Sequence, residues 1–144
     1  MSENCIFCKI ANGQIPTNMV YEDEVVAAFL DQSQVTKGHT LLVPKKHLAD
    51  IFDYDSKDAS AVFKRIPTIA QALKKAFPDM EGLNILNNNG EVAFQSVFHS
   101  HIHLIPRYNR DQDGFGLKWE THEADYQAQD LQTIAEAIHA EIEG

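Results

Sequence analysis

Residues 98–106 have the sequence Phe98-His99-Ser100-His101-Ile102-His103-Leu104-Ile105-Pro106, with histidine at every second position from 99 to 103. Aromatic and β-branched residues surround the histidines, which favours a β-strand over Ser96–Arg107. Because alternate side chains of a strand point to the same face, the three imidazoles are expected on one surface. Each ring nitrogen needs a polar partner, so three rings on one face indicate chemistry rather than core packing.

The composition is that of a single globular domain. The chain has 144 residues, of which 44% are hydrophobic and 23% charged. Its net charge of -9 argues against a protein that binds nucleic acid or an anionic membrane, because such proteins present a basic face. We find no apolar run of membrane-spanning length and no secretory leader, and we therefore expect a cytoplasmic protein.

The two cysteines lie close together, in Cys5-Ile6-Phe7-Cys8. A redox Cys-x-x-Cys pair normally lies between a strand and a helix, and no strand is predicted before this one. Metal ligation is the functional interpretation that we favour. The alternative is that both are small buried apolar residues.

The rest of the chain predicts strands and helices in one α+β domain on a mainly antiparallel sheet. The sequence indicates a helical turn at Cys5–Asn12, and a hairpin of Val20-Tyr21 with Val25–Asp31. Further strands are predicted at His39–Pro44 and Gly82–Leu86, with a short helical possibility at His47–Ile51.

Two longer segments have helical periodicity. Apolar residues recur every three or four positions over Asp55–Phe77, which predicts one long helix that Pro67 should kink. A second amphipathic helix is predicted at Gln127–Glu143, with apolar residues on one side: Leu131, Ile134, Ala135 and Ile138. The fold class expected is therefore α+β with one long helix and a C-terminal helix.

The histidine face has two chemical interpretations that spacing alone leaves open. An imidazole is nucleophilic at neutral pH and can act as acid or base, which suits phosphoryl or nucleotidyl transfer through a covalent intermediate. Alternate histidines on a strand are also a good zinc motif, and three of them with an open position activate water.

Other polar residues suit a phosphate or sugar ligand. Gln95-Ser96 and the loop Asn87–Gly90 supply neutral donors and acceptors, although an asparagine run is also typical of a turn. Asp31 follows an apolar strand and can accept both hydroxyls of a ribose, although alone it is equally a solvated cap. The chain has no glycine-rich phosphate loop of the Walker or Rossmann type.

The motifs together resemble the histidine triad (HIT) family. His99-Ser100-His101-Ile102-His103-Leu104-Ile105 matches the family's His-x-His-x-His-x-x signature, with Ser100 in place of the usual apolar residue. Several other segments are similar to the Hint branch in order and spacing: Cys5–Ile10, Phe29–Asp31, Gly38–His47 and Gln95–Phe98. The resemblance covers roughly residues 3–107, and the tail after Tyr108 departs from it. We therefore expect residues 1–144 to form a single HIT domain with a C-terminal helical extension from about residue 109.

The resemblance implies a hydrolase or transferase that acts on the α-phosphate of purine nucleoside phosphoramidates, acyl-nucleotides or dinucleotides. It implies that His101 attacks and forms a nucleotidyl-histidine, and that His103 binds the phosphate oxygens. His99 and His39 would complete the proton-relay shell. Binding roles are implied for four further residues: Asp31 and Asn88 at the ribose, and Ser96 and Gln95 at the phosphate or leaving group. A nucleotide-binding or adaptor protein with incidental hydrolysis is the alternative.

The resemblance also implies a structural zinc and a homodimer. Some bacterial members of this group resemble the chain in a Cys2His2 set, which here corresponds to Cys5, Cys8, His47 and His99. Four protein ligands close a tetrahedral zinc site, so this metal would be structural. No catalytic metal is expected, because hydrogen bonds orient the phosphate and the imidazole supplies the nucleophile.

Overall fold

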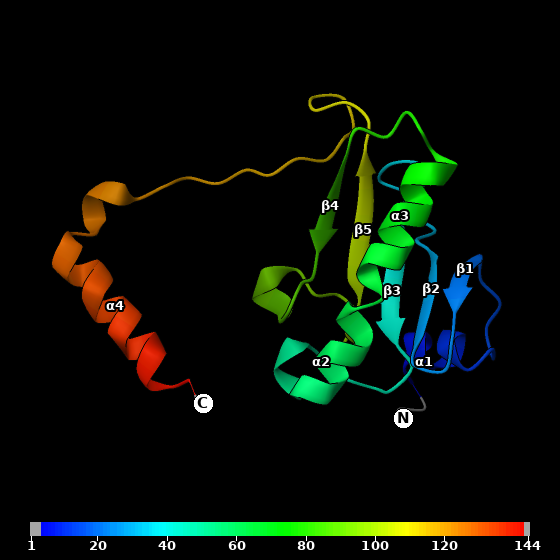
Figure 1. Cartoon of the computed structure of the whole chain (residues 1–144), viewed down its shortest axis with the longest axis horizontal. Helices are drawn as coiled ribbons and strands as arrows, with labels where there is room; N and C mark the ends of the chain where they lie inside the picture. The colour runs from blue at the N-terminus through cyan, green and yellow to red at the C-terminus, as the bar shows by residue number, and fades with distance from the viewer. Residues whose placement is uncertain (1–3, 143–144) are drawn as a thin grey trace.

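A five-stranded antiparallel sheet forms the centre of the molecule (Figure 1). In the computed structural model, which describes residues 4–142, the strand order is β1-β2-β3-β5-β4. The strands are β1 (Met19–Glu22), β2 (Val26–Leu30), β3 (Thr40–Pro44), β4 (Gly82–Leu86) and β5 (Ile102–Arg107). The predicted hairpin is confirmed as the β1–β2 pair, and the α+β class with a mainly antiparallel sheet is confirmed as well.

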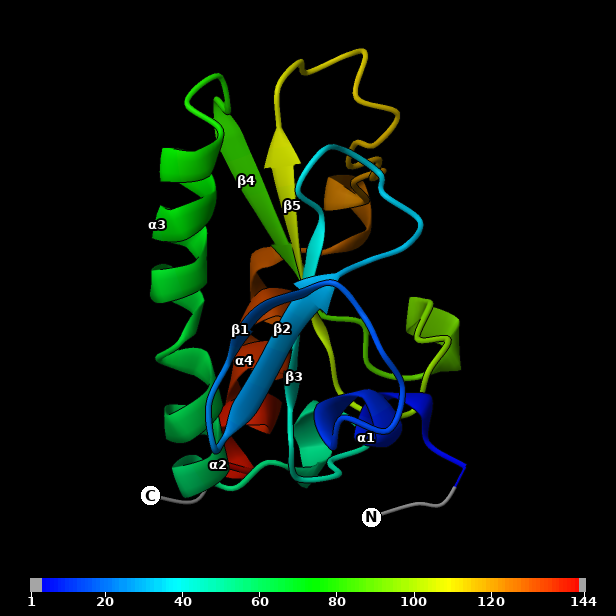
Figure 2. The same ribbon diagram turned by 90° about the vertical axis from the view of Figure 1, so that its right-hand side faces the viewer.

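Helices cover both faces of the sheet. Figure 2 shows α1 (Ile6–Ala11) on one side, and α2 (Ser56–Phe63) and α3 (Ile66–Ala76) on the other. The short helix α1 starts at Cys5, whose Sγ accepts a hydrogen bond from Cys8 N and so caps the first turn. Three short 3-10 turns lie in the connections, at Ile51–Asp53, Glu91–Ala93 and Glu123–Asp125. The short helix predicted at His47–Ile51 is thus observed a few residues later, as the 3-10 turn at Ile51–Asp53.

The sheet separates two apolar cores because its central strands are buried on both faces. All five residues of β3 are buried, and so are the first four of β2. The core on the α1 side includes Phe7, Cys8 and Phe29, and the core on the other side includes Leu42, Ile69 and Ile102. The functional side chains described below all lie on the α1 side.

The predicted strand Ser96–Arg107 is wrong in its first half, because β5 begins only at Ile102. Residues 96–101 are irregular, and Ser100 N donates to the carbonyl of Leu48 instead of joining the sheet. The alternation of side chains nevertheless holds. Ile102 and Leu104 belong to the core on the side of α2 and α3, while the rings of His99 and His101 both contact Phe7 of α1 on the opposite side.

The predicted single helix Asp55–Phe77 is two helices, α2 and α3, separated by Lys64 and Arg65. Pro67 is the second residue of α3, where its missing N–H removes no hydrogen bond. A continuous helix would bring the proline ring against the carbonyl of Phe63, four residues earlier, and α2 ends at that residue. The proline thus breaks the helix rather than kinking it.

The C-terminal helix α4 (Ala128–Ala140) lies away from the rest of the molecule in Figure 1. Gln127 and Asp130 form a capping box at its start. Its predicted last residue, Glu143, falls outside the described residues. None of the helices within residues 4–142 has the length and apolarity needed to cross a bilayer.

Gly38 is required by the loop that leads into β3. Its φ of +96° is in the left-handed region, and a Cβ there would lie 2.9 Å from a ring carbon of Phe77. Gly13 has a similar φ of +76° but open space around it. We expect Gly38→Ala to lower the free energy of unfolding by about 2–4 kcal/mol, because the strain of the left-handed backbone and the clash of the new Cβ with Phe77 both destabilise the folded state.

Chemical denaturation of both glycine variants measures this difference. Gly13→Ala carries only the cost of the left-handed backbone and should lose about 1 kcal/mol. Equal losses in the two variants would contradict the close contact with Phe77.

Candidate active site

His101 and His103 line a pocket between α1, the following loop and the ends of β2 and β3. Their ring centroids are 5.1 Å apart, and the ring of His101 lies edge-on to Phe7 with centroids 5.0 Å apart. The pocket has a volume of about 340 Å³ and an apolar wall. That wall includes Ile6, Phe7, Ile10, Ile15, Phe29, Leu30, Leu41 and Val97.

The protein backbone determines which nitrogen of His101 is basic. Nδ1 of His101 lies 2.9 Å from the carbonyl oxygen of His99. A carbonyl can only accept, so Nδ1 carries the proton and donates it. Nε2 therefore has an unshared electron pair in the neutral ring, which makes it the nucleophilic atom.

His103 is paired with His39 of the loop before β3. Nε2 of His39 lies 2.9 Å from Nδ1 of His103, and 3.6 Å from Oδ2 of Asp31. Burial lowers the pKa of His39, and burial together with the neighbouring histidines lowers the pKa of His103 to about 4. Both shifts favour the neutral form of the ring at pH 7.

Asp31 and Ser96 complete the polar part of the pocket. Both line it together with the two histidines. One carboxylate oxygen of Asp31 accepts from Ser33 N, and the other faces His39. The structure thus brings Asp31, Ser96, His101 and His103 together around one volume, with His39 directly behind His103.

Gln95 and Asn88 do not line this pocket as the structure describes it. Gln95 is only 3% exposed, and its amide is bonded to the backbone: Oε1 accepts from Gly90 N, and Nε2 donates to the carbonyls of Ala49 and Val97. It fixes the loop that presents Ser96. Contact of Gln95 or Asn88 with a ligand stays a prediction.

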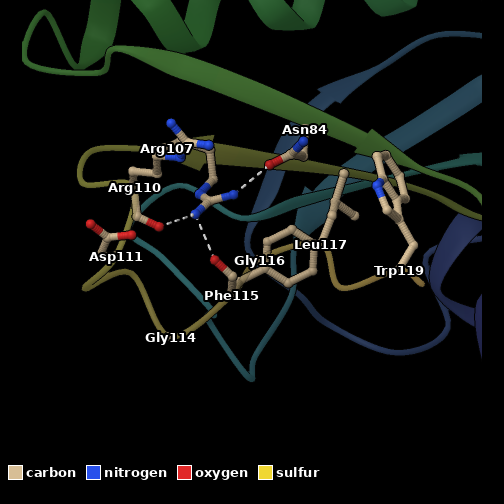
Figure 3. A pocket seen from close by; sticks show the side chains of 9 residues that line it. All are labelled: Asn84, Arg107, Arg110, Asp111, Gly114, Phe115, Gly116, Leu117 and Trp119. Carbon is tan, nitrogen blue, oxygen red and sulfur yellow. Dashed lines mark hydrogen bonds between the residues drawn. The ribbon is translucent and has the colours of Figure 1, made fainter. Parts of the chain in front are cut away.

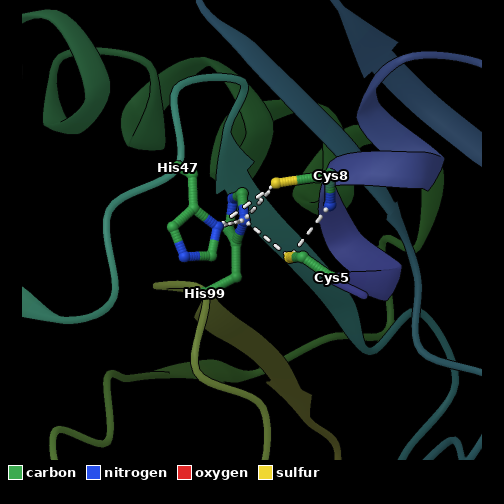
Figure 4. A group of neighbouring side chains, drawn as sticks. All are labelled: Cys5, Cys8, His47 and His99. Atoms are coloured by element: carbon green, nitrogen blue, oxygen red, sulfur yellow. Dashed lines mark hydrogen bonds between the residues drawn. The ribbon is translucent and has the colours of Figure 1, made fainter. Parts of the chain in front are cut away.

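Cys5, Cys8, His47 and His99 form a separate cluster behind the pocket (Figure 4). Nδ1 of His99 lies 3.2 Å from Cys5 Sγ and 3.4 Å from Cys8 Sγ. Nδ1 of His47 lies 3.2 Å from both Cys8 Sγ and His99 Nδ1. Tetrahedral zinc with two sulfur and two nitrogen ligands requires ligand separations of roughly 3.3–3.8 Å. The four side chains therefore fit a closed zinc site with small adjustments.

The protonation of His99 also suits a metal ligand. Nε2 of His99 lies 2.7 Å from the carbonyl oxygen of Pro44, to which it donates. The remaining nitrogen, Nδ1, is thus unprotonated in the neutral ring and faces the two sulfurs. Burial lowers the pKa of His99 to about 4, which keeps the ring neutral. A backbone carbonyl that accepts from the other ring nitrogen is a usual partner of a zinc-bound imidazole.

Asp31, His39 and His103 also lie close enough together for a shared metal, but their hydrogen bonds disfavour one. The N–H of Val35 donates to Nδ1 of His39 at 3.2 Å. A backbone N–H can only donate, so the neutral ring carries its proton on Nε2, the atom that a metal would need. This group is a hydrogen-bonded relay rather than a metal site.

A larger hollow, of about 680 Å³, lies away from the histidines (Figure 3). It is lined by residues of β4, β5 and the segment after β5. Arg107 there donates to Asn84 and to the carbonyls of Arg110 and Phe115. Its guanidinium therefore supports the local loop, and we place the chemistry in the smaller histidine pocket.

Sequence reasoning missed the backbone partners and Phe7. The carbonyls of His99 and Pro44 and the N–H of Val35 orient three imidazoles, and no side-chain pattern reveals them. Phe7 lies between Cys5 and Cys8 in the sequence and contacts the rings of His99 and His101. Since the two cysteines were expected to share a metal with His99, the contact of Phe7 with the histidines could have been predicted from its position.

Comparisons with known proteins identify the family of the chain. The family description "HIT domain" matches residues 12–110. "Protein hit" of Bacillus subtilis is 55% identical over 95% of this chain and 93% of its own length. "Adenosine 5'-monophosphoramidase hnt1" of Schizosaccharomyces pombe is 33% identical over 96% of this chain and 98% of its own length. A crystal structure of a HIT family member from B. subtilis has a TM-score of 0.94 at 53% identity, covering 99% of both chains. The chain belongs to the HIT family, as the sequence motifs predicted.

Proposed function

We propose that this protein is a nucleotide hydrolase that cleaves at the α-phosphate of purine nucleoside phosphoramidates, acyl-nucleotides or dinucleotides, through a nucleotidyl-histidine on His101. Membership of the HIT family and the S. pombe relative named as an adenosine 5'-monophosphoramidase support a nucleotide hydrolase. The hydrogen bond from His101 Nδ1 to the His99 carbonyl carries the mechanism, since it leaves Nε2 as the nucleophile.

The reaction would take two displacements. His101 Nε2 forms a bond to the α-phosphorus while the bond from phosphorus to the leaving nitrogen or oxygen breaks, and the leaving group takes up a proton from solvent. Water then attacks the phosphorus, the bond from phosphorus to the imidazole breaks, and the proton lost by this water returns to solvent as the nucleoside monophosphate leaves. His103, whose Nδ1 is held by His39, would hold a phosphate oxygen through its other nitrogen.

The rest of the pocket suits a nucleoside. Asp31 would accept the ribose hydroxyls, and Ser96 would contact the phosphate or the leaving group. The apolar wall formed by α1, β2 and β3 would pack against the base, because a purine has a large apolar face.

Loss of the nucleophile should abolish hydrolysis but leave binding. We expect His101→Gln to lower kcat for an adenosine phosphoramidate by at least about 10³-fold, because an amide cannot form the intermediate. His122→Gln, in the exposed tail, is the matched control and should keep the wild-type rate. Steady-state kinetics and AMP titration measure both effects. Unchanged turnover in His101→Gln would mean that the protein acts by another route.

We also propose that Cys5, Cys8, His47 and His99 hold a structural zinc. Two thiolates and two imidazoles suit zinc, and the closed set leaves no position for a substrate. Zinc here would join the N-terminal helix to the segment that carries His101, since the ligands come from both.

Elemental analysis should find one zinc per chain. We expect Cys8→Ser to lose the metal and about 3 kcal/mol of stability, or roughly 10 °C in Tm, because zinc binding is linked to folding. His47→Asn removes a proposed ligand and should also lose zinc. His122→Asn changes an exposed histidine in the tail and should keep it. Well under one zinc per chain, with an unchanged Tm for Cys8→Ser, would exclude the site.

Finally, we propose that the protein is a homodimer in which the second copy covers the apolar face of α4. The apolar residues Leu131, Ile134 and Ile138 are 56%, 43% and 61% exposed, and a lone 13-residue helix is only marginally stable in water. Strand β4 is an edge of the sheet, so a second copy can extend the sheet there. The B. subtilis structure matches 99% of this chain with a TM-score of 0.94, which supports the position of α4 away from the sheet.

Light scattering after size exclusion should give twice the monomer mass for the wild type. A charge in the apolar face, Ile134→Asp, should shift the mass toward the monomer and reduce the helical signal in circular dichroism. Thr133→Asp places the same charge on the other side of α4 and should leave the dimer intact. A monomeric wild type would rule the dimer out.

A further inference from the structure

The loop between β2 and β3 is closed by one side chain, Gln34. Its Nε2 donates to the carbonyls of Asp31 and His39, at 2.6 and 2.7 Å, and its Oε1 accepts from Gly38 N at 2.8 Å. A single amide thus joins the residue that follows β2 to the two that precede β3. The loop is held further by backbone bonds between its ends and by two anchors, from Thr36 to the carbonyl of Pro106 and from Tyr108 to the carbonyl of Lys37. Neither anchor contacts the ring of His39.

Closure of the loop points the N–H of Val35 at the ring of His39. Val35 is the residue after Gln34, and its N–H donates to His39 Nδ1 at 3.2 Å. This bond requires an unprotonated Nδ1, so the neutral His39 ring carries its proton on Nε2. The carboxylate of Asp31, 3.6 Å from Nε2, favours the same position for the proton.

The proton on His39 determines the state of His103. His39 Nε2 lies 2.9 Å from His103 Nδ1, so this proton is donated and His103 Nδ1 accepts it. A neutral His103 must then carry its own proton on Nε2, the nitrogen left for the pocket. An N–H there attracts a phosphate oxygen, whereas an unshared electron pair would repel it.

We propose that Gln34 is a positioning residue for the reaction, acting through Val35 and His39 to hold His103 as a hydrogen-bond donor toward the pocket. This inference rests on the proposed function, in which His103 holds the phosphate. Gln34 itself is not among the residues that line the pocket. Because a donor on His103 would meet the charge that develops on the phosphate oxygens in the transition state, its loss should lower kcat more than nucleotide affinity.

Nitrogen-15 NMR of the imidazole rings in the nucleotide-free protein tests the relay directly. We expect both His39 and His103 of the wild type to be protonated on Nε2 at pH 7.5. In Gln34→Met, which keeps the length of the side chain but removes its hydrogen bonds, we expect a mixture of both tautomers at His103. A wild-type His103 protonated on Nδ1 would overturn the proposal without recourse to any variant.

Kinetics on an adenosine phosphoramidate supply the second readout. We expect Gln34→Met to lower kcat about tenfold with KM changed less than twofold, and the exposed Gln112→Met to match the wild type. Wild-type kcat together with an unchanged His103 tautomer in Gln34→Met would overturn the role of Gln34. If the tautomer shifts but the wild type hydrolyses nothing, the positioning role stands and the proposed hydrolase function fails.

Discussion

The hydrogen bond between His101 Nδ1–H and the carbonyl of His99 is the interaction on which the proposed chemistry depends. It forms only because residues 96–101 leave the regular strand, so that a peptide carbonyl meets the ring two residues later. In a regular strand that carbonyl would be directed to a neighbouring strand. The irregular segment is thus what gives His101 a defined tautomer, in which Nε2 is available for the proposed attack.

The same irregular segment separates the three histidines into two environments. His99 is fully buried between α1 and the loop after β3, with its Nδ1 toward two thiols. His101 and His103 face the open pocket. Since His99 contributes both a ligand to the cysteine cluster and the carbonyl that orients His101, metal binding and catalysis would be joined through one residue. A structural zinc would thereby stabilise the geometry of the nucleophile.

Much of this arrangement could be predicted from sequence, for reasons that particular residues make clear. The alternation of histidines with Ser100, Ile102 and Leu104 predicted which side chains share a face, because alternation depends only on local extended backbone. The length of β5 was missed, since the anchor of Ser100 N on Leu48 is a tertiary feature. The break before Pro67 was missed because a proline within a helical pattern can either kink the helix or end it, and periodicity does not separate the two. The tautomers of His39, His99 and His101 were not predictable, because they depend on where backbone N–H and carbonyl groups point, which the pattern of side chains does not give.

The central claim is that His101 carries the nucleotide between the two displacements, and mass spectrometry of the trapped intermediate tests it most directly. Wild-type protein would be mixed with an adenosine phosphoramidate, quenched without acid, digested and analysed. A peptide that gains the mass of one AMP, with the modification on His101, is the predicted result. Turnover with the adduct on another residue, or with no adduct at any time during turnover, would contradict the account.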